Sequence, residues 1–331
     1  MTRDRGDIEH ALSKATEILA GKARPNEAIG VLTTYRVGGA AALFMVIEGQ
    51  QDLALVSRVL TTCTLPVLVI GRGSNMLVAD AGFQGLAIML GETYNSIDFG
   101  SLEKDSGKGP AQDSQIEVHT GGAVPLPVLA RKSASKGLHG LEWAVGVPGS
   151  VGGAIKMNAG GHGSDIESVL RQVHLFDLET GEDKDMTGEM CDFGYRHSNI
   201  ASTQVVLRAT FALAQGDADL ASAEIDSVVS WRRENQPGGQ NAGSVFTNPA
   251  GDSAGRLIEA SGCKGLRIGS AEVSMKHANF IQADPGGSAD DVAHLIAEVR
   301  KRVESSMGIK LQPELRIFGF NEDLISQMTG Y

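Results

Sequence analysis

The sequence predicts an α+β protein with more than one domain. Its 331 residues exceed the size at which a single hydrophobic core usually stops growing. Apolar segments typical of strands and of helices alternate along the chain, but without the regular order of a doubly wound parallel sheet. Glycine is the compositional outlier, with 42 residues against a usual share of about 7%. These observations favour short strands and helices connected by glycine-rich loops.

The first half of the chain predicts strands that are joined by helices and turns. Apolar side chains at helical spacing predict a helix over 8–20, which Gly21 ends. The segment 101–114 is rich in Lys, Asp, Gly and Ser and predicts a surface loop. Strands are expected at 42–47, 65–70, 76–78 and 86–90, and helices at about 51–61 and 124–136.

The second half predicts a further domain after a boundary at 215–218. Its clearest element is a helix over 289–307, in which Ser288 and Asp291 form a capping-box pattern and Gly308 marks the end. Strands are expected at 173–175, 205–211, 278–281 and 315–318, and helices at about 218–234 and 252–261.

A glycine-rich apolar block at 140–163 is the most informative segment of the sequence. It holds eight glycines in 24 residues together with Trp143, Val151 and Ile155, whereas a flexible linker would be rich in serine and solvated. Bare backbone between apolar side chains suits a buried segment that lies against a large ligand, because glycine permits close approach. The alternative is a tightly packed loop between core strands. Trp143 is interpreted as a core residue rather than one that stacks on the ligand.

A second glycine-rich turn, Gly71-Arg72-Gly73-Ser74-Asn75, directly follows the predicted strand at 65–70. Successive backbone amides in such a turn can form a nest that binds phosphate. The turn is not a dinucleotide fingerprint, because Met76 stands where that motif requires glycine, and no P-loop motif occurs in the chain. Together with the block at 140–163, it predicts two sides of a long, phosphate-bearing cofactor.

Composition limits the partners and the location. A net charge of −11 argues against nucleic acid, but a local basic pocket can still bind an anionic small molecule. No apolar run approaches the roughly 20 residues of a transmembrane helix, and the N-terminus lacks the apolar core of a signal peptide. Cys63, Cys191 and Cys263 fit neither a disulfide framework nor a zinc site. We therefore expect a cytoplasmic protein without membrane insertion or bound metal; its oligomeric state stays open, with a monomer favoured.

Nine motifs in one order resemble the bacterial UDP-N-acetylenolpyruvoylglucosamine reductases of peptidoglycan synthesis. The short separation between Arg196 and Ser244 resembles the family's shorter type, which lacks an extra loop with a substrate-covering tyrosine. Three positions depart from the family pattern without removing a residue assigned to the chemistry: His197, Thr247 and Gln312. The motifs lie at 34–39, 71–78, 146–154, 157–160, 195–198, 243–249, 257–259, 274–280 and 313–315.

The resemblance implies a flavoprotein with a vanillyl-alcohol-oxidase/PCMH-type FAD-binding domain of two subdomains, plus a smaller α+β substrate-binding domain. The predicted parts are an N-terminal helix at 1–24, subdomains at about 25–95 and 96–215, a substrate domain at 216–320 and a C-terminal tail at 321–331. The resemblance assigns FAD binding to Tyr35, Arg36, Gly71, Arg72, Gly73, Ser74, Asn75, Leu77, Pro148, Gly149, Ser150, Gly152, Gly153, Asn158 and Gly160.

The reaction that the resemblance implies is reduction of the enolpyruvyl group of the UDP-sugar substrate to UDP-N-acetylmuramate. NADPH reduces FAD, and the flavin then gives hydride to C3 of the enolpyruvyl ether. The negative charge left at C2 needs electrostatic stabilisation and a proton. By resemblance, Ser244 is the proton donor, and Glu314 and Arg196 flank the substrate carboxylate. Glu314 has to be protonated to help, and burial can raise its pKa.

Further residues are assigned to the substrate. Arg232 or Arg233 can meet its diphosphate, as can Lys264; the alternative for the two arginines is a solvated helix end. His277 matches a family substrate position, although a structural histidine is the competing interpretation. The other substrate-binding residues are Tyr195 and Asn248.

Two other functions remain in competition at this point. One is a different flavoprotein of the same cofactor fold, an oxidase of a sugar or alcohol, which would not require Ser244 and Glu314 in these contexts. The other is a catalytically inactive protein that binds a nucleotide sugar. The combination of Ser244, Glu314 and Arg196 argues against it, because a binding protein needs no proton donor.

Overall fold

The computed structural model describes residues 5–100 and 115–331, so the surface loop predicted at 101–114 lies outside the described residues. By its internal contacts the chain divides into two units, which we describe separately. Unit 1 comprises Met1–Ala23, Met45–Arg72 and Ala87–Arg232, and unit 2 comprises Arg24–Phe44, Gly73–Leu86 and Arg233–Tyr331. The functional domains predicted from the sequence follow chain order, whereas these units combine distant segments. The predicted domain bounds therefore stay a prediction.

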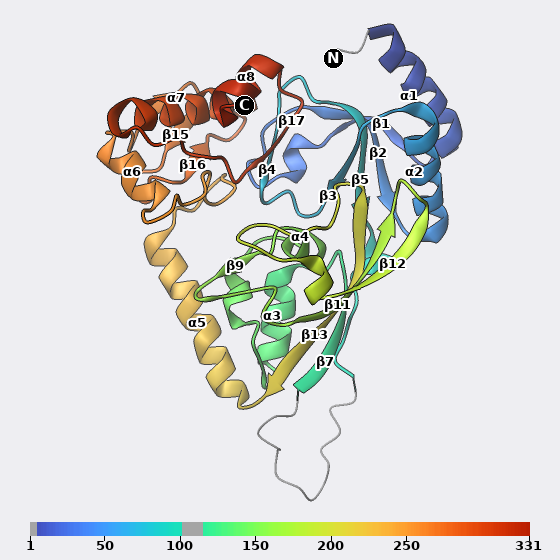
Figure 1. The fold of residues 1–331 in the computed structure, drawn as a ribbon, viewed down its shortest axis with the longest axis horizontal. Helices are drawn as coiled ribbons and strands as arrows, with labels where there is room; N and C mark the ends of the chain where they lie inside the picture. Colours follow the sequence, from blue (N-terminus) through green and yellow to red (C-terminus); the bar gives the residue numbers. More distant parts are fainter. Residues whose placement is uncertain (1–4, 101–114) are drawn as a thin grey trace, which may run out of the picture. The chain divides into compact units, whose positions relative to one another are not determined.

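Unit 1 is built around an antiparallel sheet in the order β12-β11-β13-β7-β6, with β8 also paired to β13. The long strand β13 lies between β11 and β7, and its side chain Phe211 is fully buried. Figure 1 shows these strands in green and yellow. The bounds are β6 (Ile97–Asp98), β7 (Gln115–Gly121), β8 (Leu138–His139), β11 (Leu170–Asp177), β12 (Glu182–Thr187) and β13 (Gln204–Gln215).

The helices of unit 1 include the predicted N-terminal helix, which forms α1 (Arg5–Leu19). Figure 1 shows α1 beside α2 (Gln50–Cys63), and the two helices are in contact. Ala15 and Leu19 of the predicted apolar stripe are fully buried, which explains why the helix forms here. The remaining elements are β3 (Val67–Ile70), α3 (Leu126–Ala134), α4 (Val151–Lys156), β9 (Gly160–Gly161), β10 (Ser164–Asp165) and α5 (Ala218–Asn235), the last of which ends in unit 2.

Unit 2 packs helices against short strands. Its antiparallel sheet has the order β14-β15-β16, and β4 runs parallel to β17. A further sheet has the order β1-β2-β5-β3; β1 belongs to unit 2, β3 belongs to unit 1, and the unit bounds fall within β2 and β5. The bounds are β1 (Arg24–Ala28), β2 (Ala40–Ile47), β4 (Met76–Val78), β5 (Phe83–Leu90), α6 (Ala254–Ala260), β14 (Arg267–Ile268), β15 (Ala271–Val273), β16 (Ile281–Ala283), α7 (Ala289–Met307), β17 (Arg316–Phe318) and α8 (Glu322–Thr329).

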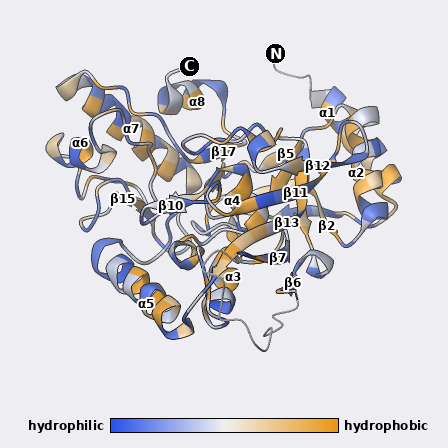
Figure 2. Cartoon of the chain, turned by 60° about the horizontal axis from the view of Figure 1, so that its bottom comes forward, coloured by the Kyte–Doolittle hydropathy of each residue, from blue (hydrophilic) through white to orange (hydrophobic). Residues whose placement is uncertain are grey.

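The helix α7 confirms the range predicted from the sequence. Figure 2 shows hydrophobic and hydrophilic residues along α7, and its hydrophobic side chains Val292, Leu295 and Ile296 are fully buried. The Oγ of Ser288 accepts a hydrogen bond from Asp291 N at 3.2 Å, as the capping pattern predicts.

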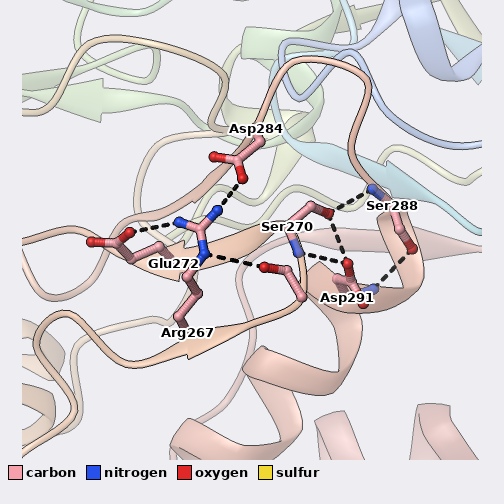
Figure 3. A network of polar contacts seen from close by, with 7 residues as sticks. Arg267, Ser270, Glu272, Asp284, Ser288 and Asp291 are labelled. Atoms are coloured by element: carbon pink, nitrogen blue, oxygen red, sulfur yellow. Dashed lines mark hydrogen bonds and ion pairs between the residues drawn. The ribbon is translucent and has the colours of Figure 1, made fainter.

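The reciprocal half of that cap is different from the prediction. The carboxylate of Asp291 accepts hydrogen bonds from Ser270 N (2.7 Å) and Ser270 Oγ (2.8 Å), and Ser288 N donates to Ser270 Oγ instead (2.8 Å) (Figure 3). Aspartate is one methylene shorter than the glutamate of a complete capping box, so Asp291 reaches across to the turn before β15. The pKa of Asp291 is lowered by these bonds from Ser270.

Two segments differ from the sequence prediction. The strand expected at 278–281 begins only at Ile281, because Asn279 uses its backbone and side chain to bind the segment around Phe246. The residues predicted as a C-terminal tail form α8, which Asn321 caps by accepting a hydrogen bond from Leu324 N at 2.8 Å. Met328 of this helix is fully buried, so packing against unit 2 stabilises it.

Candidate active site

The structure brings Ser244 and Glu314 onto neighbouring antiparallel segments of unit 2. Phe246 and Pro313 form an isolated antiparallel bridge, and Glu314 N donates to the Val245 oxygen at 2.8 Å. Both predicted catalytic side chains are half-buried. The register places Ser244 one residue from the partner of Glu314, so two residues 70 positions apart in the chain share one local framework.

No role was predicted for Asn279, although it stands in one of the nine motifs. Its side chain is 3% exposed. Its Oδ1 accepts from Phe246 N at 3.0 Å, and its Nδ2 donates to Phe246 O at 2.8 Å. The signal that could have found it is a single amide side chain between apolar residues, since a buried amide needs partners.

The glycine-rich turn at 71–75 contributes to the surroundings of Glu314 through Asn75. Asn75 Nδ2 donates to the Glu314 backbone oxygen at 3.2 Å, and Arg316 N donates to Asn75 O at 3.1 Å. The parallel pairing of β4 with β17 continues this contact. A residue predicted to bind the cofactor and one predicted to act on the substrate are therefore hydrogen-bonded neighbours.

The segment before β2 packs against the same turn. Thr34 N donates to Gly73 O at 3.0 Å, and a Cβ on Gly73 would lie 2.6 Å from the Leu32 oxygen. Tyr35 is fully buried, burial raises its pKa, and its Oη finds no hydrogen-bond partner among the described residues. An orphaned buried hydroxyl is costly, so this Oη is suited to a ligand atom. Arg36 is exposed, Ser74 is half-buried and Leu77 is a core residue.

In unit 1 the two glycine-rich segments meet at Gly71 and Ser150. A Cβ on Gly71 would lie 2.5 Å from Ser150 Oγ, so the absence of a side chain at Gly71 lets the Ser150 hydroxyl approach this backbone closely. Ser150 caps α4 by accepting a hydrogen bond from Gly153 N at 3.3 Å. This pairing fits a phosphate-bearing cofactor, because it places backbone groups and a serine hydroxyl close together without a side chain at Gly71.

The glycines of the 140–163 block have different surroundings, and the interpretation of this block as the lining of a ligand stays a prediction. Gly152 is a packing glycine: its Cβ would meet the Gly122 oxygen at 3.2 Å and Val206 at 3.3 Å. Gly153 is exposed instead, like Pro148, whereas Gly149 is buried. Trp143 is a core residue, as interpreted, and donates from Nε1 to Gly140 O at 3.0 Å.

Arg196 lies in unit 1 on a turn that the glycine block holds in place. Its Nη2 donates to Gly160 O at 3.1 Å, and Asn158 Nδ2 donates to Gly194 O at 3.1 Å. The backbone of Arg196 has φ +56°, a left-handed conformation that is rare for arginine and is often found at functional sites. Its guanidinium lies 5.3 Å from the ring centroid of Tyr195, which is 64% exposed.

The two candidate arginines for the diphosphate have different surroundings. Arg232 belongs to unit 1, donates from Nη1 to Gly146 O, and has its pKa lowered by burial. Arg233 belongs to unit 2 and is exposed, while its backbone oxygen accepts from Lys276 Nζ at 2.6 Å. The exposed guanidinium of Arg233 is therefore the better placed of the two to bind an anion from solvent.

The other predicted substrate residues have partners within unit 2. Asn248 is exposed and its Oδ1 accepts from Ala254 N at 3.0 Å, at the start of α6. Lys264 pairs with Glu259 at 3.0 Å. His277 Nδ1 accepts from Asn279 N at 3.3 Å, and burial lowers the pKa of His277, so the ring is favoured in its neutral form. These contacts support the structural interpretation of His277; its role toward the substrate stays a prediction.

Comparisons with known proteins agree with this arrangement. An FAD-binding domain model matches residues 41–186, and a model of the C-terminal domain of UDP-N-acetylenolpyruvoylglucosamine reductase matches residues 235–318. The reductase of Heliobacterium modesticaldum is 40% identical over 314 residues, which cover 93% of this chain and 94% of the relative. The reductase of Bacillus subtilis is 36% identical over 317 residues, covering 95% of this chain and all of the relative.

A solved structure of the same family is also similar to this chain. The crystal structure of UDP-N-acetylenolpyruvylglucosamine reductase from Thermus caldophilus is similar with a TM-score of 0.75 and 32% identity, over 90% of this chain and 100% of that one. The fold and the matched domains define an FAD-binding oxidoreductase of the predicted α+β class, with a vanillyl-alcohol-oxidase/PCMH-type domain. The chain belongs to the UDP-N-acetylenolpyruvoylglucosamine reductase family, as the nine motifs predicted.

Within 5–100 and 115–331, no group of three or more His, Cys, Asp or Glu side chains could hold a metal ion. Over the same residues, none of the helices has the length and apolar character needed to cross a membrane.

Proposed function

We propose that the protein reduces UDP-N-acetylenolpyruvoylglucosamine to UDP-N-acetylmuramate for peptidoglycan synthesis, on which cell shape and division depend, with NADPH as reductant. The family supports this substrate. The observation that carries the proposal is the pairing of Glu314 N with Val245 O, because it holds a hydroxyl donor and a carboxyl group on adjacent segments. An oxidase or a simple binding protein would not need this pair.

When bound, FAD would supply the hydride chemistry of this reaction, with NADPH as the source of the hydride and C3 of the enolpyruvyl group as its acceptor. The residues of this chain that would hold it are the glycine-rich segments and their neighbours. The backbone at Gly71 and the hydroxyl of Ser150 lie close together and can both face a phosphate group. The Oη of Tyr35, which has no hydrogen-bond partner among the described residues, is suited to a polar ligand atom. We propose that the other residues assigned to FAD in the sequence analysis, among them Arg36 and Gly160, also contribute to cofactor binding.

Ser244, Arg196 and Glu314 have separate tasks in this proposal. Hydride addition at C3 leaves negative charge at C2 and in the adjoining carboxylate, and Ser244 donates a proton to C2. Arg196 stabilises the charge, as a guanidinium can pair with both carboxylate oxygens. Glu314 acts in its protonated form, because an ionised carboxyl group would repel the enolate.

The UDP part of the substrate would be bound by exposed polar groups. We assign the diphosphate to Arg233 with Lys264, since Arg232 is already engaged at Gly146. Tyr195, Asn248 and His277 complete the substrate-binding set. A cytoplasmic location is part of the proposal, and it is supported by Cys63, Cys191 and Cys263, which are buried free thiols.

An anaerobic two-step experiment tests the function. The purified protein is reduced with NADPH, and the enolpyruvyl sugar nucleotide is then added while flavin absorbance is followed. Flavin colour is expected to return with this substrate only, and Ser244→Ala is expected to keep reduction by NADPH but lose reoxidation. Ser261→Ala is the matched control, because Ser261 is a half-buried serine of the same unit that bonds Leu257 and Ser306.

The outcomes separate the alternatives. A colourless protein contradicts a flavoenzyme, and reduction without substrate-dependent reoxidation contradicts this substrate. Normal reoxidation in Ser244→Ala contradicts only the assignment of Ser244 as the proton donor and leaves the proposed substrate unaffected.

A further inference from the structure

The side chain of Asn279 pairs with both backbone polar groups of Phe246. Its Oδ1 lies 3.0 Å from Phe246 N and its Nδ2 lies 2.8 Å from Phe246 O. The Asn279 backbone oxygen accepts a third bond, from Val245 N at 2.8 Å. A carboxamide carries the same donor and acceptor as a peptide group, so Asn279 takes the place of a neighbouring strand.

The opposite side of the same segment is held as well. Glu314 N donates to Val245 O at 2.8 Å, and Thr247 N donates to Gln312 O at 2.9 Å. Residues 245–247 therefore lie between Asn279 on one side and 312–314 on the other. Ser244 is the residue immediately before this clamped segment, so its backbone position relative to Glu314 depends on both sides.

The chemistry explains why an amide is needed at this position. An apolar residue of the same size would pack among the buried neighbours Phe246, Phe280 and Ile281, but it would leave the Phe246 N–H and C=O unpaired. Buried backbone groups without partners are costly, and the segment would shift to recover them. A displacement of about 1 Å at a reacting group can reduce a rate by about a hundredfold.

We propose that Asn279 is a positioning residue that fixes Ser244 beside Glu314 for the transfer of a proton to the substrate. This inference rests on the proposed function. Asn279 does not itself donate or accept the transferred proton; it acts through the backbone of Val245 and Phe246.

The test compares the two half-reactions in Asn279→Ala and Asn279→Asp. We expect the reduction of bound FAD by NADPH to stay within about twofold of the wild type, and the reoxidation by the enolpyruvyl sugar nucleotide to slow by about ten- to a hundredfold. The solvent deuterium isotope effect on reoxidation should increase, because a displaced Ser244 makes proton transfer limit the rate more strongly.

Asn279→Asp adds a rescue experiment. In its ionised form the side chain introduced by Asn279→Asp can only accept hydrogen bonds, so it cannot bond to the Phe246 oxygen. In its protonated form it can donate to that oxygen and accept from Phe246 N, which restores both bonds. The rate defect should therefore shrink as the pH is lowered from about 8 to about 6, since burial raises the pKa of a carboxyl group. His277 and Glu314 are ionisable groups of the same unit, so each rate is divided by the wild-type rate at the same pH.

Asn321→Ala is the matched control, since Asn321 makes an amide-to-backbone bond in the same unit but caps α8. It should leave both half-reactions unchanged. Normal reoxidation in both Asn279 variants overturns the proposal, and so does equal slowing of both half-reactions. Failure of both variants to give folded, yellow protein also overturns it, because Asn279 would then serve the fold of unit 2. Absence of reoxidation in the wild type would instead contradict the proposed function.

Discussion

The side chain of Asn75 donates a hydrogen bond to the backbone oxygen of Glu314, with 3.2 Å between Nδ2 and O. Arg316 N returns a bond to Asn75 O at 3.1 Å. Asn75, which is predicted to bind FAD, and Glu314, which is predicted to act on the substrate, are therefore hydrogen-bonded neighbours in unit 2. A substitution at Asn75 should therefore change the position of Glu314.

Asn75→Ala should disturb this link. The loss of one hydrogen bond should lower the free energy of unfolding by about 1 kcal/mol, and the rate of substrate-dependent flavin reoxidation should fall because Glu314 loses a support. Denaturant unfolding and single-turnover kinetics measure the two effects. Asn199→Ala is the control, since Asn199 donates to the Met190 backbone oxygen in an exposed loop. Unchanged reoxidation in Asn75→Ala would show that Glu314 is placed by β17 alone.

Gly71→Ala should weaken FAD binding. The new Cβ would stand 2.5 Å from Ser150 Oγ, which is closer than non-bonded atoms approach, so one of the two loops has to move. The fraction of purified protein that retains FAD, read from its absorbance spectrum, should fall. Gly161→Ala is the control, because none of the described residues lies within 4 Å of its Cβ position.

A double-mutant cycle identifies the cause of that loss. Ser150→Gly removes the conflicting Oγ. The loss of Ser150 as a helix cap should lower the free energy of unfolding by only roughly a few tenths of a kcal/mol. In the presence of Ser150→Gly, Gly71→Ala should be tolerated better, so the two changes should be non-additive. Additive losses would mean that Gly71 matters for a contact other than Ser150.

Arg232 and Arg233 should respond differently to the same substitution. Arg232→Met removes a charge-assisted bond to Gly146 O and should lower the free energy of unfolding by about 2 kcal/mol. Arg233→Met should leave stability unchanged but raise the KM for the UDP-sugar about tenfold, as expected for one lost diphosphate contact. Thermal unfolding and steady-state kinetics give both values. The reverse result would assign the substrate to Arg232.

Asp291 should make stability depend on acid pH. Its pKa is lowered, chiefly by the bond from Ser270 N, so the folded state binds this proton more weakly than the unfolded state. The stabilisation is present above the unfolded pKa of about 3.9 and is lost as the pH falls through the folded value. Asp291→Ala should therefore destabilise the protein near neutral pH, and the difference from the wild type should shrink below about pH 4.

Unfolding experiments across this pH range check the prediction for Asp291. Asp323→Ala serves as the control, because it removes a carboxylate from the first turn of another helix, α8. A difference between wild type and Asp291→Ala that stays constant down to about pH 2 would show that the carboxylate is not the stabilising group.

The sequence by itself determined the elements and the family. The apolar period and the Ser288 cap were enough to predict α7, because a long amphipathic helix is specified by local spacing. The nine motifs identified the family because each is a run of neighbouring residues. The glycine-rich segments were recognisable for a similar reason, since the positions without a side chain can be read directly from the sequence.

Only the tertiary structure decided which distant residues meet. The contacts of Asn279 with Phe246, of Asn75 with Glu314 and of Arg232 with Gly146 join residues from 33 to 239 positions apart. No local sequence pattern encodes such pairs, because each hydrogen bond depends on which distant segments of the chain lie side by side in the fold. The first residues of the predicted strand at 278–281 are not part of β16 for this reason: the buried amide of Asn279 is satisfied across the fold rather than along its own strand.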